Sequence, residues 1–180
     1  MRSRSVCETS WTFVHQSASS RWLPAYVGVG SNLSDPRAQV ARALEAIGRL
    51  RGCRLVASSP MYLTQPLGDV VQPAFVNAVA GLLTQSTPED LLSSLRALER
   101  ELGREPPRER WGPRVIDLDL LVVGREARST EMLTLPHPGI AARDFVLYPL
   151  ADIAPDLEVP GVGTVRQLRE RVANRGIERL

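Results

Sequence analysis

Residues 110–124 read RWGPRVIDLDLLVVG, an aliphatic stretch that contains two aspartates. The run of aliphatic residues predicts a strand. Because side chains alternate across a strand, Asp117 and Asp119 share one face, while Ile116 and Leu118 share the other. Burying an unpaired carboxylate costs several kcal/mol, and two adjacent carboxylates also repel each other. We therefore expect positive charge beside this pair.

The segments upstream of this strand predict the order of the other elements. Three apolar runs indicate strands, and two segments with helical periodicity lie among them. In chain order these are the strand 25–31, the helix 34–52, the strands 53–64 and 74–85, and the helix 86–104. Asp35 and Thr87 are suited to cap the two helices, because each directly precedes a proline.

Together with the strand that contains the aspartates, the order is βαββαβ, which is typical of a ferredoxin-like α+β fold. In that fold the sheet is antiparallel and the helices cover one face, so we expect the other face to build the site. Two extra C-terminal helices are predicted over 143–153 and 164–176.

Composition limits the class of protein. With 180 residues, 43% hydrophobic and 23% charged, we expect a single globular domain over 25–180. A net charge of +2 gives no general attraction for nucleic acid or anionic lipid. No apolar run approaches the ~20 residues of a membrane span. All 22 basic residues are arginines, so a Schiff-base lysine and a P-loop lysine are both excluded.

Residues 1–24 differ from the rest, since they are rich in serine and hold three arginines against one acid. We expect a disordered extension or an upstream start codon, with an organellar transit peptide as the alternative. Cys7 and Cys53 belong to no motif, which fits a reducing cytoplasm.

The two aspartates suggest metal chemistry. Carboxylates at i and i+2 on one strand face have Cβ atoms roughly 6–7 Å apart. Such a pair can hold two Mg²⁺ ions, as in two-metal phosphoryl transfer, and oxygen ligands favour magnesium over zinc. A solvated strand face is the alternative, but Arg110 and Arg114 favour a polyphosphate site.

A loop rich in arginine and proline precedes the aspartates. Its arginines are Arg104, Arg108, Arg110 and Arg114. The loop is either a solvated segment whose arginines pair with Glu105 and Glu109 or a cationic lid beside the metal site, with Trp111 as a shield. Composition alone does not decide between these two hypotheses.

Other segments hold weaker candidates. Phe75 and Asn77 share a strand face, where an aromatic ring and an amide could hold a flat heterocycle, although Phe75 alone fits the core better. Glu99 lies at the edge of the apolar face of the helix predicted over 86–104. His137 lies between two prolines. The GVGSNL segment lacks the third glycine of a dinucleotide loop, so its GxG is given no weight.

Six segments together resemble 6-hydroxymethyl-7,8-dihydropterin pyrophosphokinase of folate synthesis. They are YVGVGSNLSDP, QPLG, FVNAV, LERELGR, RWGPRVIDLDLL and LTLPHPGIAARDFVLYPLADIAPD, and they run in order from 25 to 156. The resemblance implies a ferredoxin-like fold and transfer of the β,γ-diphosphoryl unit of ATP to the pterin hydroxymethyl oxygen, with release of AMP. It also implies two Mg²⁺ ions. We expect a cytoplasmic monomer with no nucleic-acid or membrane partner.

The resemblance assigns roles residue by residue. Those implied for the metal ions are Asp117 and Asp119, and those implied for phosphate handling are Arg104 and Arg114. Those implied for the pterin are Thr64, Leu67, Phe75, Asn77 and Phe145. Those implied around ATP are Glu99, Trp111, Thr134, His137 and Arg143. The chain departs from the family pattern at three positions. Arg96 stands where some members have a glutamine, and Pro106 and Met132 each stand where some members have an arginine.

Two other functions share the topology. Nucleotidyl transferases and cyclases also place two aspartates on a ferredoxin-like sheet, but they cleave at the α-phosphorus and release pyrophosphate. An RNA-binding domain would need a basic sheet face with aromatic residues, and Asp117 and Asp119 argue against that.

Overall fold

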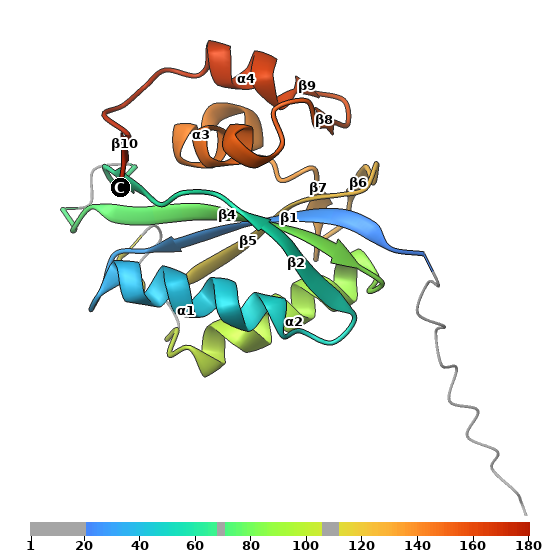
Figure 1. Cartoon of the computed structure of the whole chain (residues 1–180), viewed down its shortest axis with the longest axis horizontal. Coiled ribbons are helices and arrows are strands. Elements are labelled where there is room, and N and C mark those ends of the chain that lie inside the picture. The colour runs from blue at the N-terminus through green and yellow to red at the C-terminus, as the bar shows by residue number, and fades with distance from the viewer. Residues whose placement is uncertain (1–20, 68–70, 106–111) are drawn as a thin grey trace, which may run out of the picture.

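The protein is built around one antiparallel sheet between two layers of helices (Figure 1). A computed structural model describes residues 21–67, 71–105 and 112–180. The main strands are β1 (Leu23–Ser31), β2 (Cys53–Ser58), β3 (Tyr62–Thr64), β4 (Phe75–Thr84), β5 (Asp117–Val123) and β10 (Glu178–Arg179). The helices are α1 (Pro36–Gly48), α2 (Pro88–Glu101), α3 (Asp144–Ile153), α4 (Val165–Arg171) and the 3₁₀ turn η1 (Ile140–Ala142).

The strand order is β10-β3-β4-β1-β5, and β2 also pairs with β4. This is the expected ferredoxin-like order, with one refinement. The strand predicted over 53–64 is split into β2 and β3, which pair with successive parts of β4. Pro60 lies in the break, where it lacks the N–H that a continuous ladder would need. Two short hairpins lie outside the main sheet, formed by β6 (Arg128–Ser129) with β7 (Thr134–Leu135) and by β8 (Glu158–Val159) with β9 (Gly163–Thr164).

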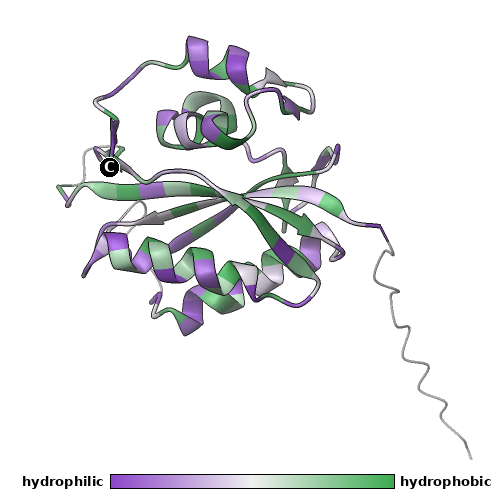
Figure 2. Cartoon of the chain, in the orientation of Figure 1, coloured by the Kyte–Doolittle hydropathy of each residue, from purple (hydrophilic) through white to green (hydrophobic). Residues whose placement is uncertain are grey.

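The predicted helix caps are confirmed. Asp35 accepts a hydrogen bond from the Ala38 N–H, and Thr87 accepts one from the Asp90 N–H. On α2, Leu91, Leu95 and Leu98 are buried. In Figure 2, α1 and α2 carry apolar residues beside polar ones, as expected of helices with one buried face.

The two faces of the sheet are covered differently. Helices α1 and α2 pack on one face, over a core that includes Val27, Ile47 and Leu95. The opposite face was expected to be open for a site, but α3 covers part of it, and a second core forms there around Leu121 and Leu147. In the described part of the chain, a pocket remains at the end of this face that holds Asp117 and Asn77.

The described part of the chain begins close to the expected start of the domain. Strand β1 begins two residues before the expected start of the domain, while residues 1–20 lie outside the described part, so their predicted disorder stays a prediction. No helix in the described part is long and apolar enough to cross a membrane.

Candidate active site

The site begins where three neighbouring strands align their side chains. Asn77 on β4 pairs with Gly30 on β1, and Gly30 pairs with Asp117 on β5. In the next row on the same face, Gly28 on β1 pairs with Asp119. The predicted common face of the two aspartates is therefore confirmed, and it is the face shared with Asn77.

The two glycines of β1 form the floor between these polar side chains. A Cβ atom at Gly30 would lie 2.7 Å from Asn77 Oδ1, so a larger residue cannot be accommodated without displacing Asn77. A Cβ at Gly28 would make ordinary contacts, the nearest at 3.6 Å to Leu121. Sequence reasoning missed this role, because it tested the GxG only as a dinucleotide loop. The signal for this role is that two glycines of β1 lie directly opposite the two aspartates. It can be recognised only when the pairing of β1 with β5 is known.

A pocket with an empty volume of about 680 Å³ opens on this floor. All five residues that the resemblance implies for the pterin line it, together with Arg114, Arg143 and both aspartates. Phe75 comes from β4 and Phe145 from α3. The buried Asn77 donates from Nδ2 to Thr64 Oγ1 at 2.7 Å. We call this the first pocket.

A second pocket, of about 900 Å³, lies on the other side of the aspartates. Glu99, Arg104, Thr134 and His137 line it, as do both aspartates. The first and second pockets therefore share one wall, made by Asp117 and Asp119.

Asp117 is held by two arginines, one from each pocket. Arg104 Nη1 lies 2.5 Å from Asp117 Oδ1, and Arg114 Nη1 lies 2.8 Å from Asp117 Oδ2. The Arg114 guanidinium also lies over the Phe75 ring, 5.9 Å from its centroid. These contacts supply the positive charge that the sequence predicted beside the aspartates.

Asp119 has a matching arrangement. Arg143 Nη1 lies 3.3 Å from Asp119 Oδ2, and the Arg143 guanidinium lies 5.6 Å from the centroid of Phe145. Burial raises the pKa of Asp119, and the charge of Asp117 raises it further, while His137 and Arg143 oppose the rise. Arg143 was implied for ATP, and the structure places it in the first pocket, beside the shared wall.

His137 approaches Asp119 from the second pocket. Its Nδ1 accepts a hydrogen bond from the Gly139 N–H at 3.0 Å, and its Nε2 lies 3.8 Å from Asp119 Oδ2. Burial lowers the pKa of His137, although the charge of Asp119 opposes this, so the ring is neutral at pH 7. With Nδ1 as an acceptor, the neutral ring carries its proton on Nε2, which faces the shared wall.

Glu99 has a defined role at the edge strand β5. It is 8% exposed and accepts a hydrogen bond from the Leu118 N–H at 2.7 Å, between the two aspartates. It also pairs with Arg104, which links it to Asp117. Burial raises the pKa of Glu99, while the Leu118 N–H and Arg104 lower it. Glu99 therefore orients the backbone that carries the aspartates.

Asn32 is a second residue that sequence reasoning missed. It is 2% exposed, and its Oδ1 accepts a hydrogen bond from the Arg114 N–H at 2.8 Å. Its Nδ2 donates to Gln72 Oε1 and to the Pro73 carbonyl. Asn32 thus joins the approach to β5 to the segment before β4, and no local pattern indicates such distant partners.

Several predicted residues lie outside the described part of the chain. These are Pro106, Arg108, Arg110 and Trp111. The hypothesis of a cationic lid over 104–114 therefore stays a prediction, although both ends of that segment, Arg104 and Arg114, contact Asp117.

Comparison with known proteins shows which family the chain resembles. A family model described as 7,8-dihydro-6-hydroxymethylpterin-pyrophosphokinase matches residues 26–155. The chain is 50% identical to 2-amino-4-hydroxy-6-hydroxymethyldihydropteridine pyrophosphokinase of Pseudomonas aeruginosa, over 86% of this chain and 95% of the relative. Its identity to the protein of the same name from Methylorubrum extorquens is 46%, over 87% of this chain and 98% of the relative.

Solved structures support the fold. Plasmodium falciparum HPPK-DHPS with pteroate superposes with a TM-score of 0.66 at 13% identity, over 84% of this chain. This chain spans 42% of that longer protein. At so low an identity the likeness bears on the fold alone, and it confirms the α+β architecture.

Proposed function

The chain belongs to the 7,8-dihydro-6-hydroxymethylpterin-pyrophosphokinase family and is an ATP-using pyrophosphokinase of folate synthesis; on that premise we propose that the first pocket binds the pterin and the second binds ATP. The observation that carries this assignment is the shared wall. Asp117 and Asp119 line both pockets, so a group held in one pocket can react with a group held in the other.

The first pocket suits a flat, polar heterocycle. Phe75 and Phe145 offer aromatic surface from two different elements, and Asn77 and Thr64 offer buried amide and hydroxyl groups. Stacking binds the faces of such a ring, while hydrogen bonds to its edge give specificity. Leu67 adds an apolar contact from the segment after β3.

The second pocket suits a polyphosphate. Arg104 and His137 present N–H donors near the shared wall, and Thr134 contributes a hydroxyl. Since the chain contains no lysine, phosphate binding falls to arginine, histidine and backbone N–H groups.

The donor set at the shared wall fits magnesium. Both aspartates present hard carboxylate oxygens, which Mg²⁺ prefers. Among residues 21–67, 71–105 and 112–180, no group of three or more His, Cys, Asp or Glu could hold a metal ion. Two carboxylates are nevertheless sufficient, because Mg²⁺ usually takes its other ligands from substrate phosphates and water. Asp117 and Asp119 would hold two Mg²⁺ ions, which would supply neutralisation of the polyphosphate and a lower pKa for the pterin hydroxyl.

The arginines around the aspartates act by exchanging partners. In the structure Arg104, Arg114 and Arg143 are paired with the aspartates. Phosphate oxygens compete for these guanidinium groups, so the arginines can turn from the aspartates to the substrate. The neutral His137 ring adds a hydrogen-bond donor, its Nε2–H group, without first having to be protonated. The chain then contributes positioning and electrostatic stabilisation rather than a strong base.

Product analysis tests the proposed reaction. The protein is incubated with ATP, Mg²⁺ and 6-hydroxymethyl-7,8-dihydropterin, and we expect AMP to form only when the pterin is present. Asp156→Ala, which removes an exposed partner of Arg166, is the matched control and should retain full turnover. Release of pyrophosphate instead of AMP would indicate nucleotidyl transfer and refute the assignment. Light scattering of the active protein would test the expected monomer.

A further inference from the structure

The first pocket has walls from two elements that are distant in the sequence. One wall is β3 with the residues after it, including Thr64 and Leu67. The other is the start of α3, which presents Phe145. The separation of these walls determines whether a ring fits between them, so whatever fastens one to the other influences pterin binding.

The C-terminal segment 172–180 contacts the first wall. Strand β10 pairs with β3, so that Glu178 lies opposite Leu63 and Arg179 opposite Tyr62. The Leu180 N–H donates to the Met61 carbonyl at 2.9 Å. This short strand covers the edge of the sheet next to the pocket.

The same segment contacts the second wall through Asp144, the first residue of α3. Asp144 is 4% exposed, and its Oδ2 accepts a hydrogen bond from the Arg175 N–H at 3.0 Å. Its Oδ1 accepts one from the N–H of Phe145 at 2.9 Å. One buried carboxylate therefore joins the C-terminal segment to the residue that lines the pocket.

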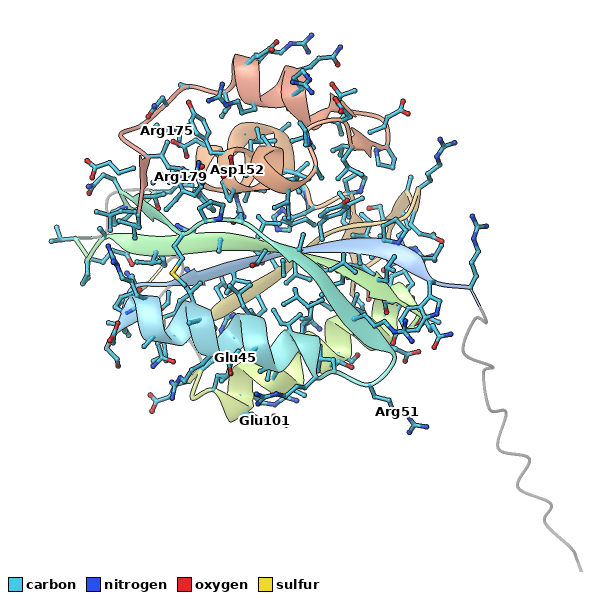
Figure 3. All side chains as sticks on the ribbon, viewed as in Figure 1. Glu45, Arg51, Glu101, Asp152, Arg175 and Arg179 are labelled. Atoms are coloured by element: carbon cyan, nitrogen blue, oxygen red, sulfur yellow. The ribbon has the colours of Figure 1, made fainter. Side chains whose placement is uncertain are left out.

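A direct contact between the walls reinforces this connection. The Tyr62 hydroxyl donates to Asp152 Oδ2 at 2.6 Å, which ties β3 to α3. Figure 3 shows Asp152, Arg175 and Arg179 at the same end of the molecule, where the C-terminal segment passes α3. The segment thus spans both walls where α3 meets the sheet.

We propose that Asp144 is a positioning residue for the pterin, and that with the C-terminal segment it sets the separation between the two walls of the first pocket. This inference rests on the assignment of the first pocket to the pterin. Asp144 does not line the pocket, so its effect passes through Phe145. In the described part of the chain, no lining residue of the second pocket belongs to α3 or to the C-terminal segment, so we expect nucleotide binding to be unaffected.

The test compares Asp144→Ala with Arg175→Ala. Asp144→Ala removes both acceptors and leaves two N–H groups without partners, which should raise the Kd of the pterin roughly tenfold. Arg175→Ala keeps the backbone N–H that Asp144 binds, so it should leave the Kd unchanged. Asp144→Asn keeps one acceptor oxygen and should give an intermediate value. Calorimetry measures the Kd of the pterin and of a non-hydrolysable ATP analogue for each variant.

Kinetics separate positioning from a general loss of structure. We expect Asp144→Ala to raise the KM of the pterin while kcat at saturating pterin stays within about twofold of the parent. A chain that ends at Ile177 provides a second variant, because it lacks β10 but keeps Asp144 and Arg175. This shortened chain should also bind the pterin more weakly, and the backbone amide hydrogen of Leu63 should exchange with solvent faster.

The outcomes distinguish this proposal from the pocket assignment. If Asn77→Ala weakens the pterin but Asp144→Ala and the shortened chain do not, the positioning role is wrong and the assignment stands. If Asn77→Ala has no effect on pterin binding, the assignment itself fails. Equal losses of pterin and nucleotide affinity in Asp144→Ala would also overturn the positioning role.

Discussion

The two pockets share a wall but are built by different means. The floor of the first pocket is strand backbone, in which Gly28 and Gly30 lie in register with the aspartates. The second pocket is lined by the surface of α2 and by the segment 130–138, which contains β7. Register in a buried sheet is strongly specified, whereas such peripheral surfaces tolerate variation. The shape of the first pocket is therefore set more strictly by the fold than the shape of the second pocket.

Two of the three departures from the family pattern agree with this contrast, and the third, Pro106, lies outside the described residues. Arg96 and Met132 both line the second pocket, and Met132 is 62% exposed. The five positions implied for the pterin all lie in the first pocket. We expect substitutions at the shared wall and in the first pocket to have larger effects than those in the second pocket, and the following predictions test that order.

The largest effect is expected at the shared wall. Asp117→Ala and Asp119→Ala should each lower kcat by at least ~10²-fold, because both pockets lose the carboxylates that would hold the metal ions. Turnover is measured as AMP formation, with circular dichroism to verify the fold and Asp156→Ala as the control. Near-normal turnover of either variant at ordinary Mg²⁺ would remove the shared wall from the reaction.

The next effect concerns the arginines of the segment 104–114. Arg114→Ala should cost about 2–3 kcal/mol in kcat/KM, since its guanidinium lies against Asp117 and Phe75, where a charged hydrogen bond to phosphate is strong. Arg108→Ala is the comparison and should cost under about 1 kcal/mol, because Arg108 lies farther along the chain from Asp117 than Arg114 does. Steady-state kinetics with both substrates decide the matter, and a greater loss for Arg108→Ala would contradict the prediction.

The floor of the first pocket offers a steric test. Gly30→Ala should cost about 2 kcal/mol in pterin affinity, because its methyl group would lie 2.7 Å from Asn77 Oδ1 and force this side chain to move. Gly28→Ala is the matched control, since its nearest contact would be 3.6 Å. Calorimetry with the pterin should show a clearly smaller loss for Gly28→Ala. Equal losses would mean that the floor does not act through Asn77.

A smaller effect is expected from the polar edge of the same pocket. Asn77→Ala should weaken pterin binding by about 1–2 kcal/mol, because a buried edge of the ring loses its hydrogen-bond partner. The affinity for an ATP analogue should not change, since Asn77 does not line the second pocket. Phe75→Tyr should be tolerated, because stacking is preserved. A comparable loss of ATP affinity in Asn77→Ala would break the division between the pockets.

The smallest effect is expected at the variable edge of the second pocket. Met132→Ala should change the affinity for the ATP analogue by no more than about 0.5 kcal/mol, as for most exposed positions. Direct titration of the parent and the variant measures this difference. A loss comparable with that of Asn77→Ala would show that the second pocket is as strictly determined as the first.

The sequence predicted what depends on local pattern. Alternation placed both aspartates on one face of β5, and the cap-proline pairs at Asp35 and Thr87 predicted the starts of α1 and α2. The βαββαβ order followed because the two helices are amphipathic and the strands are apolar runs bounded by turn residues. The pterin residues came from a resemblance to a family, and the structure brings all five together in one pocket.

What the sequence did not predict depends on distant contacts. The helix over 143–153 was expected, but periodicity cannot say which face of a sheet a helix will cover, and α3 covers part of the face that was expected to be open. The role of Gly30 requires the register with Asn77, and that of Asn32 requires partners 40 or more residues away. Hairpins such as β6–β7 are too short to show a period.

The shared wall also has a thermodynamic consequence. A ligand that draws Arg104 from Asp117 changes the electrostatic environment that Arg114 meets from the other pocket, so binding in one pocket alters the free energy of binding in the other. Linkage makes that influence reciprocal: the factor by which nucleotide changes the affinity for pterin equals the factor by which pterin changes the affinity for nucleotide. On the proposed assignment, an inhibitor aimed at the first pocket should have a potency that depends on the ATP concentration in the assay, and a molecule that spans the wall should gain from both sites at once.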